Sequence, residues 1–182
     1  MRYLFDAKRF PIILITTLLI TVLFLPGSVS ATAFTQETKL TAADTAANDQ
    51  VGYAVALRGD TLVVGARSEG NGYSFFGAVY VFRRVNSTWT ETAKLTASDP
   101  ANNNFFGFAV AINAAQDTVV VGAPQDDDNG ADSGSIYIFR ETNGTWNQEA
   151  KLVAGDGAIS DQFGYAVAIA GDTVMAGAPF DD

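Results

Sequence analysis

One segment of this sequence occurs three times with nearly the same order of residues. The copies are GYAVALRGDTLVVGA from Gly52, GFAVAINAAQDTVVVGAP from Gly107 and GYAVAIAGDTVMAGAP from Gly164. The second copy starts 55 residues after the first, and the third starts 57 residues after the second. Such a period indicates a fold built from one unit that packs against copies of itself. The two extra residues fall in the turn 113–116, where we expect a surface turn between rigid segments.

Each unit contains short segments with the pattern of β-strands. The first alternates large and small side chains, the second is apolar on both faces, the third is β-branched and aromatic, and the fourth is polar. In the two complete units the segments run over 53–57, 62–66, 78–82 and 89–95, and over 108–112, 119–123, 135–139 and 146–152. Gly-Asp, Asn-Ser and Asn-Gly pairs between them are typical of two-residue hairpins. The sequence therefore predicts an all-β fold of four-stranded antiparallel blades, as in a β-propeller, with a sandwich of hairpins as the structural alternative.

The same segments predict how the repeat region is divided. We expect a leading outer strand and its loop at 34–51, a first repeat at 52–106, a second at 107–163 and a truncated third at 164–182. These make about two and a half blades, whereas a closed propeller needs about four to eight. We therefore expect either that the chain is a piece of a longer protein or that it assembles with copies of itself.

Residues 1–33 have the three parts of an export signal. A basic start is followed by an apolar stretch at 12–25 and by the small-residue pattern at 31–33. The apolar stretch is shorter than the roughly 20 residues that a membrane-spanning helix needs. We predict a cleaved signal peptide and a secreted or cell-surface protein. Contact with a membrane is expected only if this segment stays uncleaved as an anchor.

Charge and composition exclude several classes of function. Without residues 1–33 the chain has 8 Lys and Arg against 19 Asp and Glu, so we expect no binding to nucleic acid. The sequence has no Cys and no His, which removes Ser-His-Asp and Cys-His nucleophiles and the usual zinc sites. We predict a protein that is not an enzyme and has no catalytic residues. A hydrolase or lyase with a carboxylate-plus-metal site is the alternative from another class.

The copies at 106–124 and 163–179 read FGFAVAINAAQDTVVVGAP and FGYAVAIAGDTVMAGAP, and they resemble the FG-GAP repeats. That family is best known from the β-propeller headpiece of integrin α subunits, and this sequence looks more like its bacterial exported members. The resemblance covers 34–182 and implies an extracellular propeller that binds a protein or glycan in adhesion or interaction. A carbohydrate-binding propeller, or an accessory array of a larger secreted hydrolase, is the alternative. The short turns here leave no room for the Asp-rich calcium loop that integrin-type repeats commonly carry.

A different acidic cluster follows the second GAP segment, and its members are Asp126, Asp127, Asp128 and Asp132. Several carboxylates on one turn are the hard oxygen ligands that Ca²⁺ prefers, although the spacing is not that of an EF-hand loop. We treat these residues as candidate calcium ligands, and calcium is the only cofactor that the sequence suggests. The alternative is a solvated turn whose Asp side chains bind their own backbone. The first unit has 67–70 in place of this cluster, so the cluster does not recur in every repeat.

Two further polar positions recur in all three units. The first holds Asp44, Asp99 and Asp156, and the second holds Asp49, Asn104 and Asp161. A fixed offset from the repeat motif indicates a structural role, and we interpret these side chains as caps of the turn that enters the first strand. Trp89 and Trp146 also recur, and we expect them to pack within the blades rather than to bind sugars.

Overall fold

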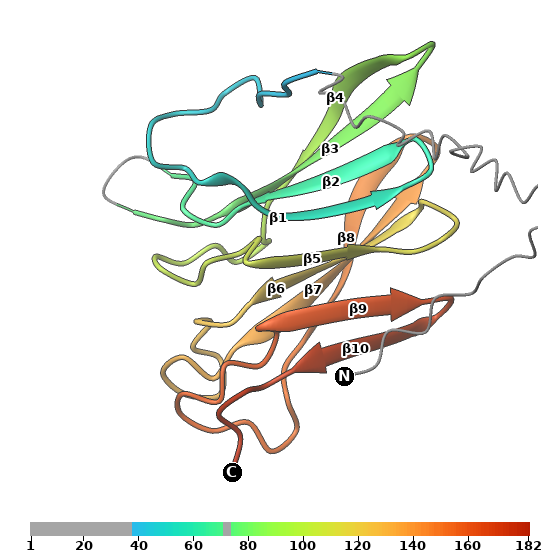
Figure 1. Ribbon diagram of the computed structural model, residues 1–182. Helices are drawn as coiled ribbons and strands as arrows, with labels where there is room; N and C mark the ends of the chain where they lie inside the picture. Colours follow the sequence, from blue (N-terminus) through green and yellow to red (C-terminus); the bar gives the residue numbers. More distant parts are fainter. Residues whose placement is uncertain (1–37, 71–73) are drawn as a thin grey trace, which may run out of the picture. The chain divides into compact units, whose positions relative to one another are not determined.

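The computed structural model describes residues 38–70 and 74–182, and within them every regular element is a β-strand (Figure 1). The first unit has β1 (Val51–Arg58), β2 (Thr61–Ala66), β3 (Ala78–Val85) and β4 (Thr88–Leu95). The second has β5 (Ala109–Ile112), β6 (Thr118–Ala123), β7 (Ser135–Thr142) and β8 (Thr145–Leu152), and the third has β9 (Ala166–Ala170) and β10 (Thr173–Gly177). The first two units are four-stranded antiparallel sheets with strands in chain order, which confirms the all-β prediction. The expected export signal lies outside the described residues.

Two-residue turns join the hairpins, as the Gly-Asp and Asn pairs predict. Gly59 and Asp60 separate the paired ends of β1 and β2, and Gly59 has a φ of 52°. Asn86 and Ser87 separate β3 from β4 with φ values of 49° and 64°, the positive pair that a type I′ turn requires. The hairpin turns, including the longer turn 113–117 between β5 and β6, lie at one end of the sheets, and the loops after the second strands and between units lie at the other (Figure 1).

The outer strand of each complete unit contains a bulge that the sequence pattern did not predict. Between the pairs formed by Val81 and Phe82, the register of β4 shifts by one residue, and Thr92 is left without a partner strand residue. Because successive side chains of a strand alternate between faces, this extra residue brings Trp89 and Lys94 to the same face. β8 has the same shift at the equivalent place.

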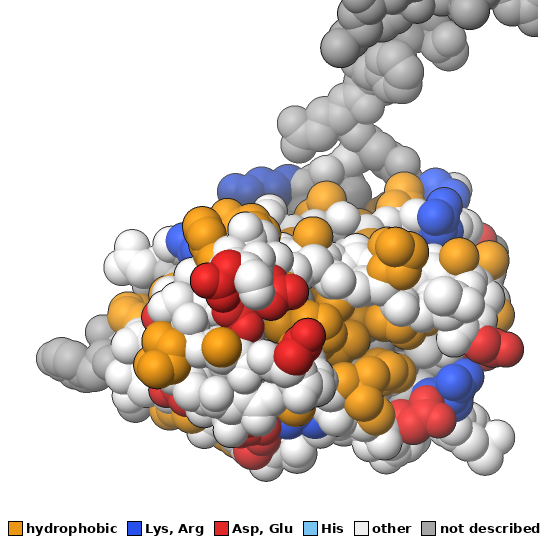
Figure 2. Space-filling view, turned by 90° about the horizontal axis from the view of Figure 1, so that it is seen from below, with side chains coloured by type: hydrophobic (Ala, Val, Ile, Leu, Met, Phe, Trp, Pro, Cys, Tyr) orange, Lys and Arg blue, Asp and Glu red, His pale blue; other side chains and the backbone are white. Residues whose placement is uncertain are grey.

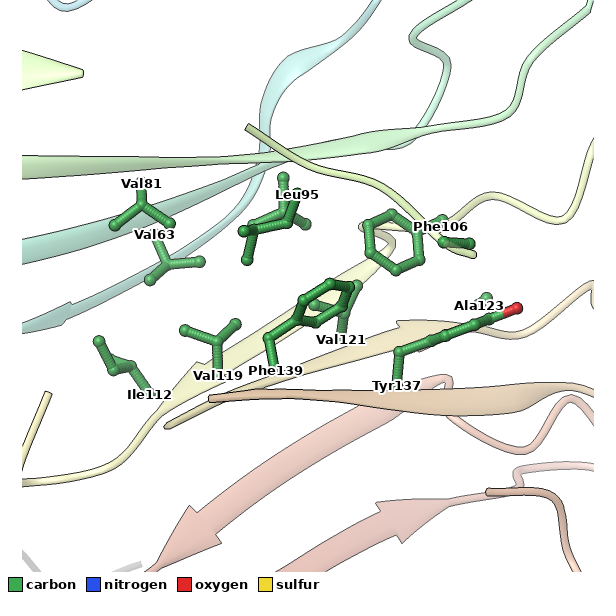
Figure 3. Packing of buried hydrophobic residues seen from close by; sticks show 12 residues of the cluster. Val63, Val81, Leu95, Phe106, Ile112, Val119, Val121, Ala123, Tyr137 and Phe139 are labelled. Carbon is green, nitrogen blue, oxygen red and sulfur yellow. The ribbon is translucent and has the colours of Figure 1, made fainter. Parts of the chain in front are cut away.

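The main hydrophobic core lies between the first and second units (Figure 3). It contains Val63, Val79, Val81 and Leu95 from the first unit and Ile112, Val119, Val121, Tyr137 and Phe139 from the second. A second cluster lies on the opposite face of the first unit, mainly over β2 and β3, and includes Leu40 and Ala42 from the segment before β1. The middle strands are therefore packed on both sides, which explains why they have no polar face. The described part of the leading segment, 38–50, has turns but no strand.

Glycines let the backbone of one unit approach the next at very short range. A methyl group on Gly65 would lie 2.1 Å from the carbonyl oxygen of Gly107, and one on Gly122 would lie 2.0 Å from that of Gly164. Gly107 and Gly164 themselves have φ values of 88° and 89°, which favour glycine. The repeated motif therefore has one glycine at its start and another near its end, because the seam between neighbouring units has no room for side chains at these two positions.

The sequence predicted that the two-residue insertion in the second unit lies in a surface turn. In the structure this turn also contacts the preceding unit. Gln116 accepts a hydrogen bond at its side-chain oxygen from the Thr61 hydroxyl, 2.9 Å away, and its carbonyl oxygen accepts one from Arg83. Arg83 also forms an ion pair with Glu141 of β7. The longer turn thus reaches back to the preceding unit and adds polar contacts to the seam between the sheets.

Candidate functional site

The longer loops of the repeats gather at one end of the sheets, and we call this the long-loop end. It is formed by the segments after the second strands, 67–70, 74–77, 124–134 and 178–182, and by the linkers between units, 96–108 and 153–165. The opposite end has the short hairpins. Loops held by a rigid scaffold are common places for binding residues, so the side chains at the long-loop end are the first to consider.

An aspartate, a tyrosine and a lysine meet at this end of the first unit, and we call such a set a clamp. The Tyr80 hydroxyl donates a hydrogen bond of 2.7 Å to one carboxylate oxygen of Asp44, and the Lys94 ammonium lies 2.6 Å from the other. Lys94 also lies 2.8 Å from a carboxylate oxygen of Glu69. The clamp therefore ties the segment before β1 to β3, to β4 and to the loop after β2.

The second unit repeats the clamp with more carboxylates. The Tyr137 hydroxyl lies 3.0 Å from a carboxylate oxygen of Asp99 and 3.0 Å from one of Asp126, and its single proton is shared between these two acceptors. The Lys151 ammonium lies 2.7 Å from Asp99, 2.7 Å from Asp128 and 3.1 Å from Asp126. Asp126 is 1% exposed, so Lys151 is the cation that compensates a buried carboxylate.

The clamps change the pKa values of their members in opposite directions. The hydrogen bonds from Lys94 and then Tyr80 lower the pKa of Asp44. For Lys151, burial disfavours the charged form, but the hydrogen bonds to Asp128 and Asp99 outweigh it and the pKa is raised. Burial, followed by the negative charge of Asp126, raises the pKa of the Tyr137 hydroxyl. Over a wide pH range, therefore, the clamp lysine and aspartate stay charged and the clamp tyrosine stays neutral.

The four candidate calcium ligands are used in different ways. Asp126 accepts hydrogen bonds from the Asn104 amide and from the backbone N–H of Asp128, in addition to its clamp contacts. Asp127 accepts a hydrogen bond from the backbone N–H of Asp132. In the described part of the chain, no three or more Asp and Glu side chains are grouped so that they could hold a metal ion. Lys151 lies among Asp126 and Asp128, and calcium binding stays a prediction.

The other recurrent polar positions divide into two roles. Asp49 and Asp161 each accept a hydrogen bond of 2.6 Å from the backbone N–H three residues earlier, as expected for a cap. Asp44 and Asp99 do not have this role, because their carboxylates bind the clamp tyrosine and lysine instead. Sequence reasoning did not predict the acidic clamp partner after the second strand: Glu69 was not a candidate, and Asp126 was a candidate only as a calcium ligand. The signal for this partner was the fixed position three residues after the last alanine of that strand.

A row of aromatic rings lies at the N-terminal ends of the first strands of the three units. Tyr53 and Phe108 have ring centroids 5.1 Å apart, and Phe108 and Tyr165 have theirs 4.8 Å apart. The Arg67 guanidinium lies 3.9 Å from the centre of the Tyr53 ring, a cation–π contact. Because these rings contact each other and Arg67, they serve first to join the units.

The tryptophans pack within the sheets, as expected. Trp146 lies against the core between the first and second units, and Trp89 lies against the cluster on the other face of the first unit. Arg84 lies 5.3 Å from the centre of the Trp89 ring. These contacts account for the fixed place of Trp in the repeat without a bound sugar.

The fold and its seams define an array of antiparallel blade units of the β-propeller type. Comparison with protein families matches the FG-GAP repeat over residues 34–82, 89–139 and 146–182. The chain belongs to the FG-GAP repeat family. A comparison with curated proteins found no match. The described residues contain no helix of the length and hydrophobicity needed to cross a membrane.

Proposed function

We propose that this chain is an exported, non-enzymatic interaction module whose long-loop end binds an extracellular protein or a cell surface. The observation that carries the proposal is the separation of the two ends: the loops after the second strands and the linkers between units lie at one end, and the hairpin turns, including the longer turn 113–117, lie at the other. The residues best suited to catalysis at this end, the clamp carboxylates and lysines, are paired with one another. These pairs join the loops to the strands, which supports a structural role for the groups.

The charge of the long-loop end indicates the kind of partner. Acidic side chains such as Asp127 and Asp156 are exposed there, while Lys94 and Lys151 point their charges at carboxylates. An acidic surface favours a partner with a basic surface, because complementary charge speeds association and selects the partner. The proposed partner is therefore a basic region of an extracellular protein.

The test is binding of the purified, fluorescently labelled protein to the surface of the cells that produce it. Reversing two exposed charges at the long-loop end, Asp156→Lys with Asp182→Lys, should weaken binding at least several-fold and reduce its dependence on salt. Asp172→Lys in the opposite hairpin is the matched control and should bind normally. Protease treatment of the cells should abolish binding. Loss after periodate oxidation alone would favour a glycan ligand, and unchanged binding by the reversed variant would contradict the proposed face.

A further inference from the structure

Two sheet faces at opposite sides of the array are exposed. Each corresponds to one side of the seam that joins neighbouring units. The first is the open β1 face, formed by Val55 and Leu57. The second is the open β9–β10 face, formed by Ala166, Ala168, Met175 and Gly177. Figure 2 views the molecule from the side of β9 and β10 and shows hydrophobic side chains gathered in a band across this side.

Equivalent side chains elsewhere in the chain are buried against a neighbouring unit. Leu57 is 57% exposed, whereas its counterpart in the second unit, Ile112, is 3% exposed. Met175 is 69% exposed, whereas its counterpart in the first unit, Val63, is fully buried. Ile112 and Val63 belong to the same core cluster between the units. The open faces thus have the apolar side chains that are buried at the interior seams, but no neighbouring unit packs on them.

The glycines at these faces give a more specific indication. Gly177 is the counterpart of Gly65 and Gly122, but a methyl group there would meet nothing closer than the Ala166 side chain at 3.8 Å. Gly52 has a φ of 94°, close to that of Gly107, yet a methyl group on it would meet no atom within 4 Å. Gly52 therefore has the backbone conformation that enters a seam, and Gly177 has the free space that receives it.

We propose that a second copy of this chain covers the open β9–β10 face with its own open β1 face, so that Gly52 of one copy lies against Gly177 of the other. The interior seams supply the argument, because the same pairing of faces occurs twice within the chain and is continued by the added copy. The contact is heterologous, because the open β1 face of one copy packs on the open β9–β10 face of the other, and each copy has both faces. It goes beyond the proposed function, because it uses sheet faces and leaves the long-loop end open.

The heterologous geometry permits a complementation experiment on the full chain by sedimentation equilibrium. Val55→Glu places a charge on the open β1 face, where the side chain is 64% exposed and the change leaves the fold intact. Gly177→Ala fills the space on the open β9–β10 face, and its φ lies outside the left-handed region. The unaltered protein should show at least twice the monomer mass. Each variant alone should stay monomeric, and an equal mixture should form a one-to-one dimer, because one intact face of each kind remains.

The controls separate this contact from general stickiness. Gly155→Ala changes another exposed glycine with open space around it and should assemble like the unaltered protein. The N-terminal segment is the same in every sample, so any association that it causes would be the same in every sample. Thermal melts of both variants in dilute solution should match that of the unaltered protein. A monomeric unaltered protein, full association of either variant alone, or a mixture that stays monomeric would overturn the proposal.

Discussion

At the scale of single residues, the clamp is the most informative feature of this chain. Each clamp joins the linker that enters a unit to the third and fourth strands of that unit, through Asp44 in one case and Asp99 in the other. The two clamps differ in burial. Lys94 binds carboxylates that are partly exposed, whereas Lys151 lies within 3.1 Å of the buried Asp126.

This difference predicts unequal effects of the same substitution. Lys151→Met leaves the buried Asp126 without its cation and should lower the free energy of unfolding by about 3 kcal/mol. Lys94→Met leaves Asp44 and Glu69 without their lysine, but these side chains are 52% and 18% exposed. The free energy of unfolding should therefore fall by only about 1 kcal/mol. Urea denaturation measures both values. Adding Asp126→Asn to Lys151→Met should recover part of the loss, and equal losses for the two lysines would contradict the account.

The clamps also predict how stability depends on pH. The pKa values of Asp44 and Asp99 are lowered in the folded protein, so the stability that they contribute is present above the unfolded value of about 3.9 and is lost as the pH falls. The clamp lysines and tyrosines have raised pKa values, so their contribution is complete below about pH 10 and is lost as the pH rises further. Thermal melts should show a plateau from about pH 5 to 9 and lower midpoints on both sides. Asp99→Asn should flatten the acidic side, and a midpoint that keeps rising below pH 4 would be inconsistent with this assignment.

At the scale of elements, the strands and tight turns could be predicted from the sequence because they depend on local patterns. Alternation, β-branched runs and Asn or Gly pairs are properties of neighbouring residues. The bulge at Thr92, the contact of Gln116 with Thr61 and the clamp partner Glu69 depend on strand register and on segments far apart in the chain. The offset of Asp44 from the repeat motif was visible in the sequence, but its partners were not, because a β-bulge decides on which face Lys94 lies.

The acidic loop after β6 gives a prediction about calcium. The loop is held by its own hydrogen bonds, from Asp132 to Asp127 and from Asp128 to Asp126, and by Lys151. A cation that enters would have to displace the lysine or use the exposed carboxylates alone, so we expect weak Ca²⁺ binding at most. Calorimetric titration of the protein checks this, with Asp127→Ala as the comparison. Submicromolar affinity that disappears in Asp127→Ala would show that the loop is a calcium site.

At the scale of the whole molecule, the units join through a seam that has three parts. Apolar side chains such as Val63 and Val119 form its core, Arg83 and Glu141 pair across it, and glycines bring the backbones together at its edge. The repeat is therefore more than a recurrence of strands, because each copy carries both faces of the seam. That double set of faces lets one sequence motif build an array.

The central claim is that the motif glycines are needed because the next unit packs against them, and substitution of the three equivalent glycines tests it most directly. Gly65→Ala and Gly122→Ala would each place a methyl group about 2 Å from a backbone oxygen of the next unit, which should cost about 2 kcal/mol or more. We expect thermal midpoints in dilute solution to fall by roughly 4–8 °C for both. Gly177→Ala, with open space at the same position, should leave the midpoint unchanged or slightly higher. Equal midpoints for all three variants would contradict the account.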